Sequence, residues 1–238
     1  MTRTLQDILA DFVETSPETI GMTLIHMSSA TTREPIIAAL QAAVGPLTHF
    51  EAVRDVEGHP TKCATEPGKI RTAGEIGCLL SHVGAMRKAL AEHKTHLCIF
   101  EDDCALGSMF SLGAVEVYLR DVKELSKRYS FAGTDDFLLF GSCGCYNARP
   151  ITNGTKATNQ FNGTHCYLVG KAMMEKVVGS YEHLLKNKVV FPIDGLLGLV
   201  LRAQHRWTLC PEDEKGLFVQ NREVPSYVLN DGTELRRE

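Results

Sequence analysis

Three consecutive acidic residues, Glu101, Asp102 and Asp103, are the residues of this 238-residue chain best suited to chemistry. They directly follow an apolar run at residues 97–100, which has the length of a strand buried on both faces and contains neither Gly nor Pro. Adjacent carboxylates repel one another unless a positive group joins them. Because Mg²⁺ and Mn²⁺ prefer oxygen ligands, one interpretation is a divalent cation carrying a phosphate-bearing ligand. The alternative is a solvated acidic turn at the end of a strand.

The composition limits the class of protein. The chain is 44% hydrophobic and 23% charged, with a net charge of −4, which fits a globular protein with a sizeable core. Because it has no basic stripe with interleaved aromatic residues, nucleic acid is not an expected partner. The N-terminus lacks the apolar core of a signal peptide, and no apolar run is long enough to span a bilayer. We therefore expect a cytoplasmic protein without stable membrane insertion, associated at most peripherally with the inner face of the membrane.

The eight cysteines form no CxxC pair, and Cys143 and Cys145 alone are a weak signal for a metal site. In a reducing compartment, most of these cysteines are expected to be small buried hydrophobic residues. A cysteine-based metal or redox protein remains an alternative.

The apolar periodicity predicts strands that alternate with helices. The strands are expected at residues 22–26, 47–53, 97–100, 136–141, 164–169, 206–210 and 217–219, and the helices at 5–13, 33–44, 72–90, 115–125, 171–185 and 195–203. Thr72 and Glu75 form a capping-box pattern at the start of the long helix. Gly74 and Gly77 are costly in its first turns and indicate close approach of another backbone or of a ligand. The polar stretch 144–162 is expected to be a loop that is mobile until a ligand binds.

The sequence GEIGCLLSH at residues 74–82 is followed by IFEDD at residues 99–103. These two motifs, in this order, resemble glycosyltransferase family 25, which includes bacterial lipooligosaccharide galactosyltransferases and collagen galactosyltransferases, and they carry most of the resemblance. Further segments resemble family motifs in the same order: TLIH at 23–26 with Arg33, DFLLFG at 136–141, THCYLV at 164–169 and FPID at 191–194.

The resemblance implies an α/β fold of the GT-A type, a Rossmann-like open twisted sheet with helices on both faces in a single domain. We accordingly expect an N-terminal amphipathic helix and linker (1–20), a GT-A-like domain (21–225) and a C-terminal tail (226–238). The resemblance also implies transfer of a hexose, commonly galactose, from a UDP-sugar with inversion, assisted by Mn²⁺ or Mg²⁺. The acceptor would be a hydroxyl of a lipooligosaccharide-type glycan or of a protein.

Inverting transfer needs a carboxylate that takes the proton of the acceptor hydroxyl. Asp194 is the candidate base; helix capping is its alternative role, and Asp135 and Asp136 are alternative bases. Asp103 is the candidate metal ligand, and Glu101 or Asp102 is expected to be a second ligand or a contact to the donor ribose. The remaining candidates for donor binding are His26, Arg33, Glu75, Ser81, His82 and His165.

Several of these residues also have structural interpretations. Glu75 completes the capping box, Arg33 suits a surface salt bridge, and His82 suits a partly buried structural position. Two other functions fit the same acidic strand end, namely a metal-dependent phosphohydrolase and a non-catalytic nucleotide-sugar-binding module. Phosphate release from a UDP-hexose without dependence on an acceptor would indicate the first, and binding without turnover would indicate the second.

Overall fold

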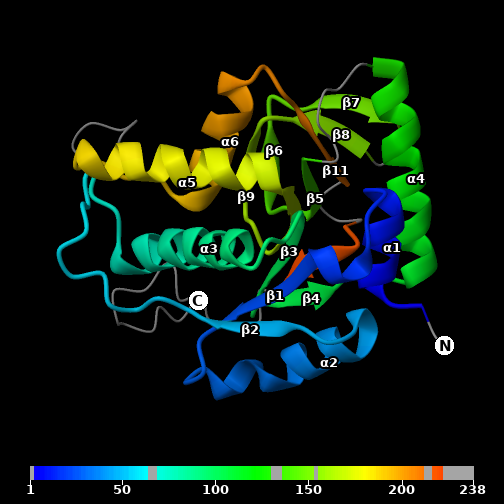
Figure 1. Cartoon of the computed structure of the whole chain (residues 1–238), viewed down its shortest axis with the longest axis horizontal. Coiled ribbons are helices and arrows are strands. Elements are labelled where there is room, and N and C mark those ends of the chain that lie inside the picture. Colours follow the sequence, from blue (N-terminus) through cyan, green and yellow to red (C-terminus); the bar gives the residue numbers. More distant parts are fainter. Residues whose placement is uncertain (1–2, 64–68, 130–135, 153–154, 212–215, 222–238) are drawn as a thin grey trace, which may run out of the picture.

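The computed structural model describes residues 3–63, 69–129, 136–152, 155–211 and 216–221. Its helices are α1 (Leu5–Phe12), α2 (Glu34–Val44), α3 (Ala73–Ala91), α4 (Leu112–Tyr129), α5 (Lys171–Lys186) and α6 (Ile193–Ala203), with short 3-10 helices at Pro17–Thr19 and Thr31–Arg33 (Figure 1). Its strands are β1 (Ile20–His26), β2 (Thr48–Glu51), β3 (His96–Glu101), β4 (Cys104–Leu106), β5 (Phe137–Gly141), β6 (Gly144–Tyr146), β7 (Arg149–Thr152), β8 (Thr155–Thr158), β9 (Gln160–Asn162), β10 (Cys166–Gly170), β11 (Thr208–Pro211) and β12 (Phe218–Gln220). Among these described residues, no helix is both long enough and apolar enough to cross a bilayer.

A five-stranded sheet in the order β2-β1-β3-β10-β5 forms the centre of the fold. β1 pairs in parallel with β2 and with β3, whereas β10 is antiparallel to its neighbours β3 and β5. The sheet is therefore parallel apart from β10. Every residue of β5 and β10 is buried, as is the interior of β3, which is why these segments are continuous apolar runs in the sequence.

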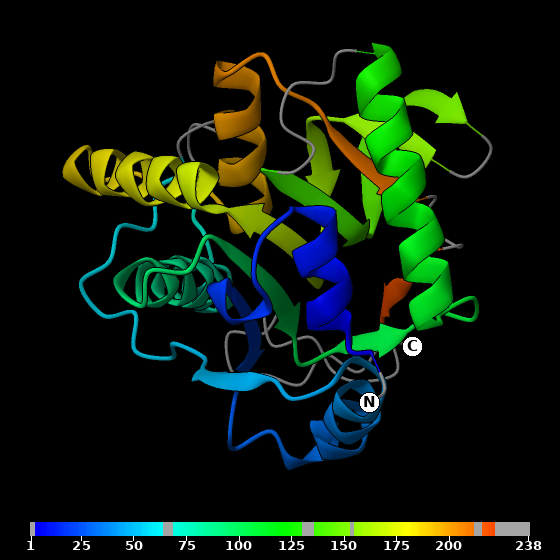
Figure 2. The ribbon, with the colours of Figure 1, turned by 45° about the vertical axis from the view of Figure 1, so that its right-hand side comes forward.

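Side-chain alternation along β3 divides the core into two layers. Cys98 and Phe100 belong to the layer that contains α1, α2 and α4, whereas Leu97 and Ile99 belong to the layer of α3, α5 and α6. Figure 1 shows α3 and α5 side by side, and Figure 2 shows α1 next to α4 on the other side of the sheet. The predicted α/β sheet with helices on both faces is thus confirmed.

The N-terminal helix α1 packs into the first of these layers. Leu5 and Leu9 have no exposed surface, and Ile8 is also buried. Thr4 and Asp7 form a capping box at its start, so the helix has both a defined beginning and an apolar face to bury.

The prediction of a loop at residues 144–162 is wrong, because this stretch forms the strands β6 to β9. β8 pairs with β7 and with β11, and β6 pairs with β9. Ala157 and Thr158 of β8 are fully buried. The strand partner β11 lies about fifty residues further along the chain, so the local polar composition gave no sign of this pairing.

Close packing at the start of α3 explains Gly77, as the sequence indicated. A Cβ atom at this position would lie 2.5 Å from the backbone oxygen of Val53. The segment around Val53 is fixed in turn, because its N–H donates to Ser81 Oγ at 2.8 Å and Ser81 Oγ donates to Gly77 O at 2.7 Å.

We predict that Gly77→Ala lowers the free energy of unfolding by about 1–3 kcal/mol, because the added methyl group forces the Val53 segment away from α3. Gly179→Ala in α5 is the matched control, since no atom lies within 4 Å of a Cβ there. That variant is expected to raise the free energy of unfolding by about 0.5–1 kcal/mol through helix propensity alone. Urea denaturation measures both values, and an equal gain at the two positions would contradict the packing argument.

Candidate functional site

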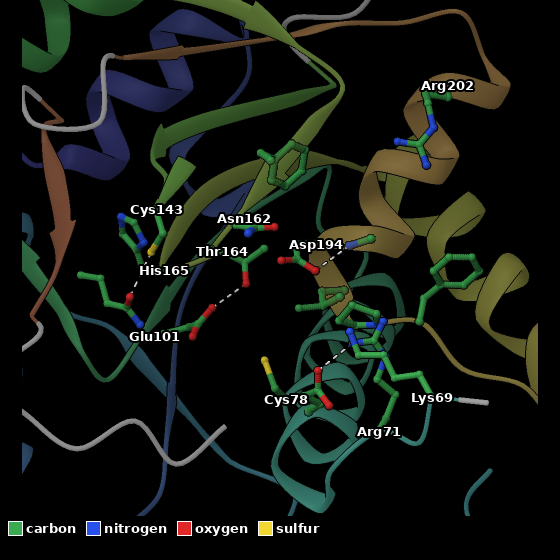
Figure 3. Close-up of a pocket in the computed structure, with 18 residues that line it drawn as sticks. Lys69, Arg71, Cys78, Glu101, Cys143, Asn162, Thr164, His165, Asp194 and Arg202 are labelled. Atoms are coloured by element: carbon green, nitrogen blue, oxygen red, sulfur yellow. Dashed lines mark hydrogen bonds and ion pairs between the residues drawn. The ribbon is translucent and has the colours of Figure 1, made fainter. Parts of the chain in front are cut away.

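A pocket of about 610 Å³ lies at the carboxyl end of β3, beside the first turns of α3 and α6. This is the edge of an α/β sheet where ligands commonly bind. The polar residues of its wall are Lys69, Arg71, Glu75, Glu101, Asn162, Thr164, His165, Asp194, Arg202 and Gln220, together with the thiols of Cys78 and Cys143. Figure 3 shows Glu101, Thr164, Asp194 and Cys78 pointing toward a common space.

Glu101 is the last residue of β3 and continues the face of Leu97 and Ile99 into the pocket. Thr164 Oγ1 donates a hydrogen bond to Glu101 Oε1 at 2.6 Å, and His82 Nε2 lies 3.3 Å from the same oxygen. Burial raises the pKa of the Glu101 carboxyl, but the His82 imidazole and the Thr164 hydroxyl together lower it below its ordinary value. Glu101 is therefore held in its ionised form.

Asp102 lies outside the pocket wall and contacts the last residue of β1 and residues that follow this strand. It forms a buried ion pair with Arg33, and its Oδ2 atom lies 3.2 Å from His26 Nδ1. The backbone N–H of Met27 donates to the same oxygen at 3.3 Å. Arg33 is 4% exposed, so the pair is buried rather than the surface salt bridge that was its alternative interpretation.

Asp103 is buried with only one of its side-chain oxygens satisfied within the described part of the chain. Gln220 Nε2 donates to Asp103 Oδ2 at 3.0 Å, whereas Oδ1 has no hydrogen-bond partner among the described residues. Burial, and then the negative charge of Glu101, raises the pKa of Asp103 to about 6. A buried carboxylate oxygen without a partner, next to a second carboxylate, fits a hard divalent cation such as Mn²⁺ or Mg²⁺.

Asp194 lines the pocket from the first turn of α6. Pro192 is the N-cap of that helix, so Asp194 does not occupy the cap position, although its Oδ1 atom accepts a hydrogen bond from the Gly195 N–H at 2.7 Å. Burial raises the pKa of the Asp194 carboxyl despite the backbone amides of Gly195 and Gly163. Asp136, an alternative base, is ion-paired with Arg206 and does not line the pocket; Asp135 lies outside the described residues.

The histidine candidates and Ser81 are buried around this site. Ser81 bonds to backbone groups of Gly77 and Val53 and does not line the pocket. His165 is 2% exposed, its Nε2 atom lies 3.3 Å from Phe218 O, and its Nδ1 atom has no hydrogen-bond partner among the described residues. Burial lowers the pKa of His165, so its ring is neutral.

The predicted capping box of α3 is present, and Glu75 also faces the pocket. Glu75 Oε2 accepts a hydrogen bond from the backbone N–H of Thr72 at 2.9 Å, and Glu75 Oε1 accepts one from Arg71 Nη1 at 2.9 Å. Glu75 therefore has the structural role, and through Arg71 it also helps to orient a cation of the pocket wall.

Sequence reasoning missed the cations of the pocket, Lys69, Arg71 and Arg202, and the hydroxyl of Thr164. Arg71 directly precedes the helix cap Thr72, and Thr164 precedes His165 in a motif already singled out, so both had a local signal. Lys69 and Arg202 had no local signal, because only the folded chain brings them to the same pocket wall.

Residues 27–197 match the family model described as glycosyltransferase family 25 (LPS biosynthesis protein), which is well over half of the chain. The chain belongs to glycosyltransferase family 25. The resemblance that its motifs carry is thereby confirmed.

One curated relative and two solved structures are similar to this family 25 chain. A stretch of 66 residues is 39% identical to lipooligosaccharide biosynthesis protein lex-1 of Haemophilus influenzae, covering 28% of this chain and only 20% of that protein. Mannose-1-phosphate geranyltransferase of Thermus thermophilus is 11% identical with a TM-score of 0.32, over 82% of this chain and 58% of its own. Apo UDP-glucose pyrophosphorylase is 7% identical with a TM-score of 0.36, over 94% and 81% of the two chains. Scores this low carry no argument about the site.

We predict that Arg33→Met and Asp102→Asn each lower the free energy of unfolding by about 3–5 kcal/mol, because each leaves a buried charge without its partner. The double variant is expected to lose less free energy of unfolding than the sum of the losses in the two single variants. Lys127→Met is the control, since Lys127 and Glu124 form an exposed pair worth less than about 1 kcal/mol. Urea denaturation provides the values, and a loss at Arg33 no larger than that at Lys127 would rule out a structural role for the pair.

The raised pKa of Asp103 predicts a pH dependence of stability. Since the native carboxyl has a pKa of about 6 against an ordinary value of 3.8, its favourable contribution is complete below about pH 4 and is lost as the pH rises through 6. Without divalent cations, Asp103→Asn is therefore expected to be about 1–3 kcal/mol more stable than the wild type at neutral pH. Urea denaturation across this pH range should show the difference shrinking toward pH 4; a constant difference would contradict the assignment.

Proposed function

We propose that this protein is a glycosyltransferase on a GT-A-type fold, which moves a hexose, galactose in the family's common case, from a UDP-sugar to a hydroxyl of an acceptor with inversion. The observation that carries the proposal is a pair of carboxylates facing one pocket, Glu101 and Asp194, whose pKa values are shifted in opposite directions. Two acids with opposite shifts suit different tasks at one reaction centre. Membership of family 25 supports the reaction class.

The donor's diphosphate would lie toward the cationic part of the wall. Lys69 and Arg71 both line the pocket, just before α3 begins. Positive side chains favour an anionic ligand, and the guanidinium of arginine suits phosphate oxygens in particular. Glu75 and His165, which also line the pocket, are the other donor contacts that we propose.

Glu101 and Asp103 are the residues that would hold Mn²⁺ or Mg²⁺. When bound, the ion would neutralise charge on the departing nucleotide diphosphate. The remaining candidates, His26, Arg33, Asp102, Ser81 and His82, act in this proposal by fixing the acidic segment and α3. They are buried behind the wall and line no part of the pocket.

Asp194 is the proposed general base. Its carboxylate takes the proton of the acceptor hydroxyl while that oxygen attacks the anomeric carbon from the side opposite the diphosphate. The bond from the anomeric carbon to the diphosphate oxygen breaks, and its electron pair leaves with the nucleotide. A pKa raised by burial brings the carboxyl closer to the proton affinity that this task needs.

The acceptor that we propose is a lipooligosaccharide-type glycan or a protein hydroxyl. The family description names LPS biosynthesis, and the relative from Haemophilus influenzae is named as a lipooligosaccharide biosynthesis protein, which favours the glycan. Such an acceptor would be met in the cytoplasm at the inner face of the membrane.

We predict that Asp194→Asn lowers kcat for sugar transfer by at least ~100-fold, because the amide fills the same space but accepts no proton. Donor binding, followed by calorimetry with UDP-galactose, UDP-glucose and Mn²⁺, is expected to stay near the wild-type Kd. Asp136→Asn is the matched control, because Asp136 pairs with Arg206 away from the pocket.

The assay should measure both sugar transfer to a panel of glycan and peptide acceptors and release of phosphate. If Asp136→Asn abolished sugar transfer and Asp194→Asn kept it, Asp136 rather than Asp194 would be the base. Phosphate release without dependence on an acceptor would overturn the transferase in favour of a phosphohydrolase, and donor binding without turnover on every acceptor would favour a binding module.

A further inference from the structure

A second group of potential ligands lies on the same pocket wall. Cys78 and His82 are four residues apart on α3, so their side chains share one face of the helix, and that face meets Glu101 at the end of β3. The thiol sulfur, an imidazole nitrogen and a carboxylate oxygen of these residues all lie within 4.8 Å of one another. The proposed transfer reaction gives the Cys78 thiol no role, and the His82 imidazole only supports the acidic segment in it.

His82 is fully buried and is fixed from one side only. Its Nδ1 atom lies 2.7 Å from the hydroxyl oxygen of Tyr167, and the imidazole ring is stacked on the Tyr167 ring. Its Nε2 atom is directed at Glu101, 3.3 Å from Oε1, but makes no well-formed hydrogen bond within the described part of the chain. A buried ring nitrogen directed at a carboxylate and near a thiol, without a hydrogen bond of its own, is an unusual feature.

The contact with Tyr167 suits a metal-binding tautomer. Without an ion, Nε2–H faces Glu101 and Nδ1 accepts from the Tyr167 hydroxyl; when an ion takes the place of that proton, Nδ1–H donates to the Tyr167 oxygen and Nε2 gives its lone pair to the ion. Histidine ligands of metals generally donate their other ring N–H to a fixed partner in this way. The carboxylate is held similarly, because Thr164 donates to Glu101 Oε1 at 2.6 Å.

We propose that Cys78, His82 and Glu101 form a binding site for Zn²⁺ or a similar soft divalent cation in the wall of the pocket. Thiolate and imidazole select such ions over Mg²⁺ and Mn²⁺. Ligand atoms around a tetrahedral zinc ion lie ~3.5 Å apart, so small side-chain rotations close the present spacing. Three protein ligands leave the fourth position open toward the pocket, which is also the route of entry, since Cys78 and Glu101 both line it.

Binding would be linked to loss of a proton. Burial, and then the charge of Glu101, raises the pKa of the Cys78 thiol well above its ordinary value, so the residue is protonated without a metal. The ion displaces this proton to solvent when the sulfur becomes a thiolate ligand. Because the site shares Glu101 with the donor site, zinc would also compete with donor binding; this consequence alone rests on the proposed function.

Titration of the metal-free full chain with Co²⁺ tests the site. The expected result is one bound ion per chain with a thiolate-to-cobalt charge-transfer band in the near ultraviolet, which added Zn²⁺ abolishes. Cys78→Ser is expected to remove the band, and His82→Asn to weaken Co²⁺ binding at least tenfold. Cys143→Ser is the matched control, because Cys143 is a second thiol of the same wall, bonded to Gln220 at 3.0 Å, and it should leave the band unchanged.

The wild-type spectrum decides the proposal even if a variant does not fold. No charge-transfer band in the wild type, or a band that persists in Cys78→Ser, would overturn it. The measurement uses neither donor nor acceptor. A cobalt band in a protein that transfers no sugar would therefore support the metal site and contradict the proposed function. Sugar transfer by a protein without the band would support the proposed function and contradict the metal site.

Discussion

Removing three consecutive carboxylates from water at the end of β3 is the energetic problem around which the site is arranged. A buried carboxylate is unfavourable unless a positive group or hydrogen-bond donors compensate it. Each of the three carboxylates is compensated by different groups. Thr164 and His82 contact Glu101, and Arg33 forms an ion pair with Asp102. Asp103 accepts a hydrogen bond from Gln220 at one oxygen only. The incomplete compensation of Asp103 is the feature that makes this strand end suited to a cation.

The single antiparallel strand of the central sheet explains how these partners meet. β10 runs against β3, so the residues that precede β10 lie beside the residues that end β3. Thr164 reaches Glu101 for this reason, and the N–H of Glu101 donates to His165 O at 3.0 Å. Tyr167, further along β10, faces α3 and fixes His82. One reversal of strand direction therefore supplies both the hydroxyl and the aromatic support of the pocket wall.

The candidate residues fall into two groups according to what satisfies their polar atoms. Arg33, Asp102 and Ser81 are paired with other parts of the chain and stabilise the frame of the site. Glu101, Asp194 and Cys78 face the pocket and have capacity for a ligand. The two carboxylates of this second group differ in their surroundings, so they suit the two tasks of the reaction that we propose, a fixed negative charge at Glu101 and a proton acceptor at Asp194.

The sequence by itself determined the elements whose signals are local. The apolar run of β3, the capping box of Thr72 and Glu75, and the need for glycine at residue 77 each depend on neighbouring residues or on a helical period, and all are present. The acidic strand end and Asp194 were likewise visible as candidates, and the family was identifiable from the order of its motifs. Only the tertiary structure decided which carboxylate faces the pocket, that residues 144–162 form strands, and that Lys69, Arg71 and Arg202 line the same wall. These outcomes depend on partners that lie up to more than a hundred residues away, because burial, strand pairing and charge compensation are properties of the packed chain rather than of any segment.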